Sequence, residues 1–219
     1  MGTTRRAGLA GAVLLLGALS SGCAGDPEAY PPTGVDGLVI PTPAPDPGDF
    51  VAEVDNPWFP LEPGTRWSYA DAGGPRTVAV ALRGPVVDGV RTTALRTSTP
   101  RPNGHRSTTT DYYAQDRAGD VWWFGRAGEW RAGPGAGAGL AMAAHPRRGD
   151  GYAMTPAPDG VRAVVVATGM RWHSPLGSTH RAVMLEVVRD GVADVETFAP
   201  GIGLVSKGET GLVSYQPRP

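Results

Sequence analysis

The stretch NPWFPLEPGTRWSY, residues 56–69, marks the point where a proline-rich segment ends and a β domain begins. Each of its prolines fixes its own φ and pushes the preceding residue toward extended geometry, so this stretch does not lie inside a helix. Pro63-Gly64 predicts a turn, because proline presets one φ and glycine tolerates the next. The alternation of polar and aromatic residues that follows predicts a strand with Trp67 and Tyr69 on one face.

The aromatic residues of this stretch allow two interpretations. Trp58, Phe59 and Leu61 add apolar surface just before the predicted strand. In the first interpretation they form a plug, an extended arm at the entry to the β domain that seals one end of the core. In the second they form an aromatic lid over a ligand cavity.

The rest of the chain shows strand signals and no helical periodicity sustained over three turns. Residues 76–83 (RTVAVALR) alternate, with Val78, Val80 and Leu82 on one face, and Gly-Pro and Asp-Gly turns are expected to follow. Residues 131–139 (RAGPGAGAG) predict a flexible loop without a phosphate-binding motif. Further strands are predicted over 90–99, 106–115, 120–125, 161–168, 181–189, 192–198, 202–207 and 210–216.

The last four of these strands are joined by tight turns, which predicts an antiparallel meander. So many short strands with almost no helix to cover them must curl or split into two layers. We therefore predict an all-β fold: an antiparallel, strongly curled sheet, half-barrel or sandwich-like, with little helix. A single β domain is expected over residues 50–219.

Residues 1–22 are typical of a signal peptide, with Arg5 and Arg6 before an apolar run over residues 7–19 that is too short to span a bilayer. Cys23 follows and is the only cysteine, so the chain cannot form an internal disulfide. The segment up to Cys23 resembles a bacterial lipobox, with Ser20 where leucine is usual. The resemblance implies a lipid anchor on Cys23; the alternative is a plain signal peptide with an incidental thiol.

Residues 23–49 combine this cysteine with a proline-rich tether, which favours extended polyproline geometry. Leu38–Ile40 within it could add an edge strand to the domain. The expected location is the extracytoplasmic face of the cell membrane, with a lipid anchor and no spanning helix. The partners expected are the membrane and an apolar ligand or a partner in the cell envelope.

Charge argues against a nucleic-acid partner. The formal net charge is −1, and removal of residues 1–22 leaves 18 basic against 21 acidic residues. A domain so close to neutral lacks the basic surface expected for nucleic-acid binding.

Residues with catalytic potential do not form a recognisable pattern. The four histidines, His105, His145, His173 and His180, lack metal-site spacing, and no GxSxG motif is present. A carboxylate pair among Asp111, Asp116, Asp120 and Glu129 stays open, although two of these fall at turns, where aspartate is common. We expect no enzyme activity, no metal site and no cofactor.

Aromatic residues supply the candidate ligand-binding set. The chain has six tryptophans, many for one small domain, and Trp122 and Trp123 are adjacent, so they point to opposite sides of a strand. One can lie in the core, and the other is either covered by the N-terminal arm or exposed as a contact. The residues predicted to line a ligand site are Trp58, Trp67, Tyr113, Trp122 and Trp123.

Three blocks resemble a group of uncharacterised bacterial exported lipoproteins whose domains open with an NPxFPLxPGTxWxY phrase. They are residues 56–69, the DYYAQD and GxVWxFG segments within 111–125, and APGxGLV at 199–205. The group has no established activity, so the resemblance implies no catalytic residues. The predicted sheet is similar, at the level of fold alone, to half-barrel lipoproteins of the LolA type.

Three functional hypotheses follow. The first is a non-catalytic binding module for an apolar ligand or an envelope partner, which requires a cavity. The second is a structural or interaction lipoprotein whose own side chains fill the sheet. The third is a hydrolase, which requires histidines or carboxylates that converge in a cleft.

Overall fold

The structure, a computed structural model, describes residues 46–72, 74, 76–157 and 160–218. All of them belong to a single compact unit within Pro32–Pro219. The predicted signal peptide, Cys23 and the tether up to residue 45, with Leu38–Ile40, lie outside the described residues.

The described chain is all-β, as predicted, with one short 3-10 helix, η2 (Pro47–Asp49), and no α-helix among its described residues. Its strands are β1 (Arg66–Ala70), β2 (Thr77–Val87), β3 (Val90–Pro100), β4 (Arg106–Gln115), β5 (Val121–Arg126), β6 (Trp130–Arg131), β7 (Gly139–Met142), β8 (Gly151–Ala153), β9 (Arg162–Ser174), β10 (Gly177–Arg189), β11 (Val192–Ala199), β12 (Gly203–Lys207) and β13 (Thr210–Gln216).

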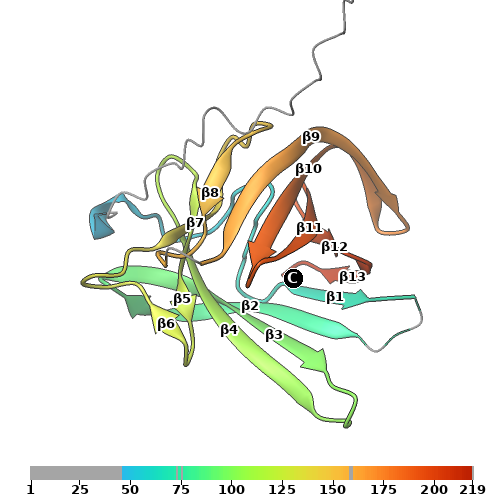
Figure 1. Cartoon of the computed structure of the whole chain (residues 1–219), viewed down its shortest axis with the longest axis horizontal. Coiled ribbons are helices and arrows are strands. Elements are labelled where there is room, and N and C mark those ends of the chain that lie inside the picture. Colours follow the sequence, from blue (N-terminus) through green and yellow to red (C-terminus); the bar gives the residue numbers. More distant parts are fainter. Residues whose placement is uncertain (1–45, 73, 75, 158–159, 219) are drawn as a thin grey trace, which may run out of the picture. The chain divides into compact units, whose positions relative to one another are not determined.

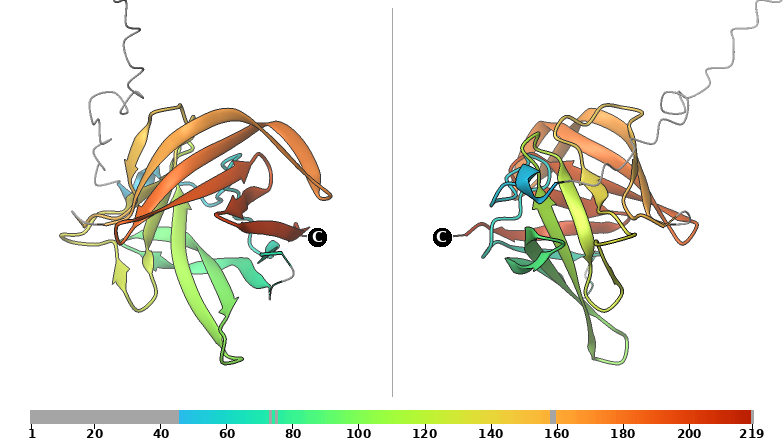
Figure 2. Two further views of the ribbon diagram at one scale, coloured as in Figure 1. Left: turned by 45° about the vertical axis from the view of Figure 1, so that its right-hand side comes forward. Right: turned by 90° about the vertical axis from the view of Figure 1, so that its left-hand side faces the viewer.

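These strands form one antiparallel sheet. The strand order is β6-β5-β4-β3-β2-β1-β13-β12-β11-β10-β9-β8, and β7 pairs with Val121–Trp123 of β5, next to β6 on the edge away from β4. The pairing of β1 with β13 joins an N-terminal group of strands to a C-terminal group. Figures 1 and 2 show β2–β4 on one side of the core and β9 and β10 on the other.

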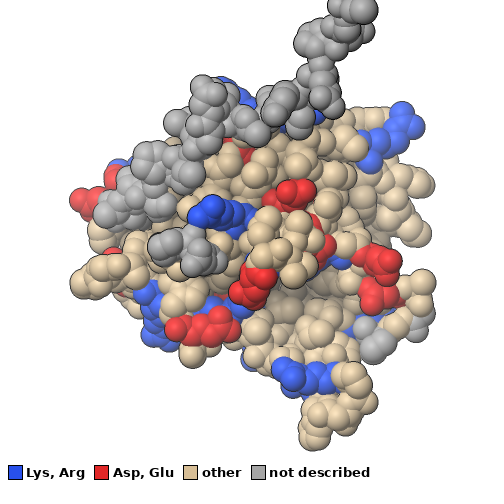
Figure 3. Space-filling view, viewed as in Figure 1, with Lys and Arg blue, Asp and Glu red and all other residues tan. Residues whose placement is uncertain are grey.

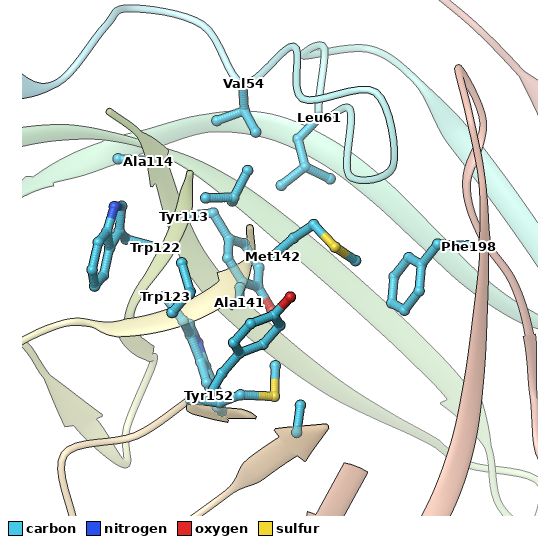
Figure 4. Packing of buried hydrophobic residues seen from close by; sticks show 14 of the residues in the cluster. Val54, Leu61, Tyr113, Ala114, Trp122, Trp123, Ala141, Met142, Tyr152 and Phe198 are labelled. Carbon is cyan, nitrogen blue, oxygen red and sulfur yellow. The ribbon is translucent and has the colours of Figure 1, made fainter. Parts of the chain in front are cut away.

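The core lies between these groups of strands, and the N-terminal arm (residues 50–65) contributes to it. Val54 and Leu61 of the arm are buried. Figure 4 shows them pointing toward the same core as Tyr113 of β4, Met142 of β7 and Phe198 of β11. Phe50 packs edge-on against Phe124 of β5, so the arm also covers that strand.

Several local predictions are confirmed. Pro63-Gly64 is a turn, with Gly64 at φ 110°, and Trp67 and Tyr69 share the buried face of β1. The predicted C-terminal meander is present as β10 to β13.

Other local predictions are wrong in detail. Gly84-Pro85 is not a turn but lies inside β2, where the register with β3 shifts between Arg83 and Val86. Proline is tolerated in a strand at such a bulge, because no ladder hydrogen bond is needed from it there. The Gly/Ala segment 131–139 is mostly a loop, as predicted, in which Gly133 and Ala136 form a bridge, and its last residue begins the buried strand β7.

Candidate functional site

A cavity of about 390 Å³ lies against the inner face of the sheet. Its lining comes from β1–β5 and β7 and from β10–β13, so both halves of the strand order face it, together with the arm. The apolar part of the lining consists mainly of Phe59, Leu61, Leu95, Met154, Phe198 and Leu204.

A continuous row of aromatic rings forms one wall of this cavity. Phe59 of the arm contacts Phe198 of β11 and Tyr113 of β4, with ring centroids 6.0 and 5.1 Å apart. Behind this row, the ring of Tyr113 stacks on Trp123 at 6.4 Å, and Trp123 itself does not line the cavity. Phe59 therefore links the two halves of the sheet across the cavity.

The opposite end of the cavity is polar. Thr97 of β3 pairs with Thr109 of β4, and both lie two residues nearer the β3–β4 turn than Leu95 and Asp111. Thr77 and Thr99 lie nearer still to this end, and Thr99 is exposed. The lining thus changes from apolar at the arm to hydroxyl-bearing toward the β3–β4 hairpin.

Two ion-pair clusters line the cavity from opposite halves of the sheet. On β4 and β5, Asp111 accepts a 2.7 Å hydrogen bond from Nε of Arg126. On β10 to β12, Glu196 lies 2.9 Å from Arg189 and 3.2 Å from Lys207. Both carboxylates are buried, so breaking either cluster would leave a charge in a poorly hydrated place.

Burial raises the pKa of the Asp111 carboxyl, and this effect exceeds the lowering by the hydrogen bond and charge of Arg126. The carboxyl therefore stabilises the fold fully below its unfolded pKa of about 4, and that contribution is lost as pH rises through its folded pKa. We expect wild type to lose stability relative to Asp111→Asn as pH rises from about 3 to about 7.

Urea unfolding of both proteins across that pH range measures this effect. The asparagine has the same charge and nearly the same shape as the protonated acid, so the two proteins are matched at low pH. A gain of wild type over the variant with rising pH would mean that the ion pair with Arg126 outweighs burial.

Of the residues predicted to bind a ligand, Trp67 and Tyr113 line the cavity. Trp67 is buried, and its indole N–H donates to the carbonyl of Ile202 at 2.7 Å, which ties β1 to the segment before β12. Tyr113 carries the aromatic row described above.

The other three predicted residues do not line it. Trp58 is half-buried, and its indole N–H donates to the Arg181 carbonyl at 3.2 Å. Trp122 and Trp123 are both buried, and each indole N–H is bonded, to Asp116 at 2.8 Å and to the Gly125 carbonyl at 2.9 Å. Trp122 shares a strand face with Phe124, and Phe50 of the arm packs on Phe124. Because both tryptophans are buried, neither is an exposed contact.

Charged residues of the cavity were not predicted from the sequence, apart from Asp111. Arg126, Glu196 and Lys207 sit at inward positions of β5, β11 and β12. The signal available was alternation: in DVETFA, residues 194–199, Glu196 shares a face with Phe198. The same pattern fits an outward polar face, so alternation alone does not distinguish the two.

Of the carboxylates left open as a catalytic pair, Asp111 and Glu129 share Arg126, at 2.7 and 3.7 Å, and Glu129 is exposed. All four histidines are exposed, and the described residues contain no group of histidines and acids able to hold a metal ion. Asp116 accepts from Trp122, and Asp120 accepts from the backbone N–H of Ala144 at 2.6 Å, so both hold turns together.

Surface charge is mixed on the face shown in Figure 3, where basic and acidic residues are interspersed. Within the described ranges there is no helix whose length and apolarity would let it cross a bilayer.

Comparisons of the chain with protein-family models, with curated proteins and with solved structures find no match.

Proposed function

We propose that the mature protein is a lipoprotein, anchored through Cys23 on the extracytoplasmic face of the cell membrane. Its β domain is a non-catalytic binding module for an apolar ligand. The anchor is supported by the apolar run before a lone cysteine and by the proline-rich tether after it.

The half-barrel or sandwich-like curl belongs to this proposal. It is supported by the cavity, whose lining comes from both halves of the strand order. It is also supported by a close approach between β7 and the end of β8, because a methyl group at Gly139 would overlap the Met154 carbonyl. A sheet bent in this way encloses a concave inner face.

The single observation that carries the binding role is the cavity with its graded lining. Its volume of about 390 Å³ lies in the range of roughly 300–1,000 Å³ usual for small-molecule sites. The charged lining residues are Arg126, Arg189 and Lys207 against Asp111 and Glu196, an excess of one positive charge. This lining suits an amphiphile with an apolar body and one anionic end.

Native mass spectrometry of the protein purified from its host tests this role directly. A co-purifying lipid or fatty acid of defined mass supports the proposal. A bare protein that also fails to bind an added fatty acid contradicts it.

Filling the cavity should weaken ligand binding strongly without disturbing the outer surface of the domain. Thr97→Trp places an indole inside the lining of β3, and we expect it to weaken binding of a fluorescent fatty acid at least tenfold, since the ligand and the indole compete for one volume. Thr168→Trp makes the same change on an exposed position of β9 and should leave affinity within about twofold. Equal affinities of the two variants would exclude the cavity as the binding site.

The second candidate, a structural or interaction lipoprotein without a ligand, is favoured by one observation. Each charged lining residue of the cavity already pairs with another lining residue. The Thr97→Trp variant separates the two roles. If the protein binds no ligand, filling the cavity should leave its role unaffected and leave its free energy of unfolding unchanged or raised.

A further inference from the structure

A second, shallow groove of about 560 Å³ lies on the outer face of β1–β4. Its floor holds Val78 and Val80, with Ser98 and Thr108 beside them. Arginines surround this floor; the four of them, which we call the arginine face, are Arg66, Arg76, Arg96 and Arg106.

The strand register spreads these arginines in two dimensions. Val80 pairs with Arg66 of β1 on one side and with Arg96 of β3 on the other, so two guanidinium groups flank one valine. Arg76 and Arg106 lie at the other end, where Arg106 donates to the Arg76 carbonyl at 3.0 Å. The four positive charges thus occupy corners around an apolar centre and do not form a line.

The charge of the arginine face is not compensated by an ion pair within the described part of the chain. No acid lines the groove, and none of the four arginines takes part in an ion pair among the described residues. Arg106 is held by hydrogen bonds to Ser98, 2.8 Å to Oγ and 2.6 Å to the carbonyl, and both acceptors are neutral. Uncompensated like charges repel one another, and an anionic partner removes that cost.

We propose that the arginine face binds the headgroup plane of an anionic phospholipid bilayer. A planar array of phosphates matches charges spread in two dimensions, whereas a linear phosphate polymer matches charges in a row. The valines at the centre suit the boundary between headgroups and acyl chains, and the arginines around them pair with phosphates. This proposal does not depend on the cavity or its ligand.

Co-sedimentation with vesicles tests the proposal. The full chain carrying Cys23→Ser, which cannot be acylated at that position, is compared with the same chain carrying Arg66, Arg76, Arg96 and Arg106→Gln. Residues 1–45 are otherwise identical in both, so their contribution cancels. The measured quantity is the ratio of partitioning into phosphatidylglycerol vesicles to that into phosphatidylcholine vesicles.

Each basic residue at an anionic surface strengthens binding roughly fivefold, so the variant that lacks all four arginines should lose about 600-fold in this ratio. Binding of the Cys23→Ser chain with all four arginines to anionic vesicles should also weaken steeply between about 0.05 and 0.5 M salt. A matched control removes as much charge from exposed positions elsewhere on the domain. It carries Arg147, Arg148, Arg171 and Arg181→Gln, and it should change the ratio less than about fivefold.

Three results would overturn the proposal. Equal losses in the two fourfold variants would mean that net charge alone drives binding. If the Cys23→Ser chain with all four arginines binds both kinds of vesicle equally at low salt, the face recognises no lipid charge, and this holds even if the fourfold variant fails to fold. If soluble polyphosphate displaces the protein from the vesicles at a phosphate concentration below that of the vesicle lipid, the face would be assigned to a linear polymer.

Discussion

Replacing Asn56 with alanine is expected to lower the free energy of unfolding by about 3–5 kcal/mol, the largest effect we expect from a single side chain. Asn56 is the first residue of the NPWFP phrase and is 1% exposed. Its amide nitrogen donates to the carbonyls of Gly119 and Ala143, at 2.9 and 3.2 Å. Its carbonyl oxygen accepts from the backbone N–H groups of Trp58 and Phe59, at 2.9 and 3.1 Å.

The magnitude follows from the groups left behind. Alanine removes the partner of the Trp58 N–H and of the Gly119 and Ala143 carbonyls. The Phe59 N–H keeps the Asn56 backbone carbonyl at 3.1 Å. An unsatisfied buried group costs about 1–3 kcal/mol, less where water reaches it. The arm would also lose the side-chain bonds that tie Asn56 to the β4–β5 turn and to the segment after β7, while the bridge between Phe50 and Asp116 remains. Because Phe59 belongs to the aromatic wall of the cavity, ligand binding should weaken as well.

Urea unfolding followed by tryptophan fluorescence measures the loss. Asn103→Ala is the matched control, since the Asn103 side chain also accepts a backbone N–H two residues on, from His105 at 3.1 Å, but in an exposed turn. It should cost less than about 1 kcal/mol. An Asn56→Ala loss as small as that of the control would show that the arm is not held by this side chain.

Gly139→Ala is expected to cost about 3 kcal/mol, because the new methyl group would meet backbone and not a flexible side chain. Its Cβ would overlap the carbonyl group of Met154 and lie 2.8 Å from the Thr155 nitrogen. Gly139 pairs with Trp123 of β5, so β7 cannot move away without breaking that pairing. The strain should push the end of β8 outward and open the cavity near Met154.

Gly137→Ala controls this prediction within the same segment. Gly137 is exposed, and a Cβ there would have open space within 4 Å. Its effect should stay within about 0.5 kcal/mol. Thermal unfolding of the two variants, together with hydrogen exchange at residues 151–154, distinguishes a local opening from general destabilisation; equal stabilities would contradict the close approach of β7 and β8.

Local sequence signals predicted the strands and turns well. Asp88-Gly89 and Asp190-Gly191 have positive φ at both positions, 48° and 76°, and 51° and 75°, as hairpin turns of this type require. The unbroken burial of β5 follows from residues that are apolar on both faces. These features were predictable because each depends on a few neighbouring residues.

The inward face of β2 was not predictable in the same way. Val78, Val80 and Leu82 do share one face, but it is the outer, half-buried one, and Ala79 and Ala81 face the core. The small side chains lie inside because Ala79 pairs with Trp67 of β1, whose buried indole occupies the inner face beside it. Alternation defines two faces, and contacts from elsewhere in the chain select between them.

Of the aromatic residues predicted to bind a ligand, Trp67 and Tyr113 line the cavity and the adjacent tryptophans do not. Trp122 and Trp123 hold β5 in place through bonds to Asp116 and to the Gly125 carbonyl. An aromatic residue signals burial in the sequence, but whether it borders a void depends on which side chains fill the space opposite.

The sequence by itself determined that this chain forms antiparallel strands and where its turns lie, because periodicity and turn chemistry act over a few residues. Only the tertiary structure decided that β1 pairs with β13, that Asn56 anchors the arm, and that two ion-pair clusters face one cavity. Those features join residues that are far apart in the chain, and their energies depend on burial and distance, which no local pattern specifies.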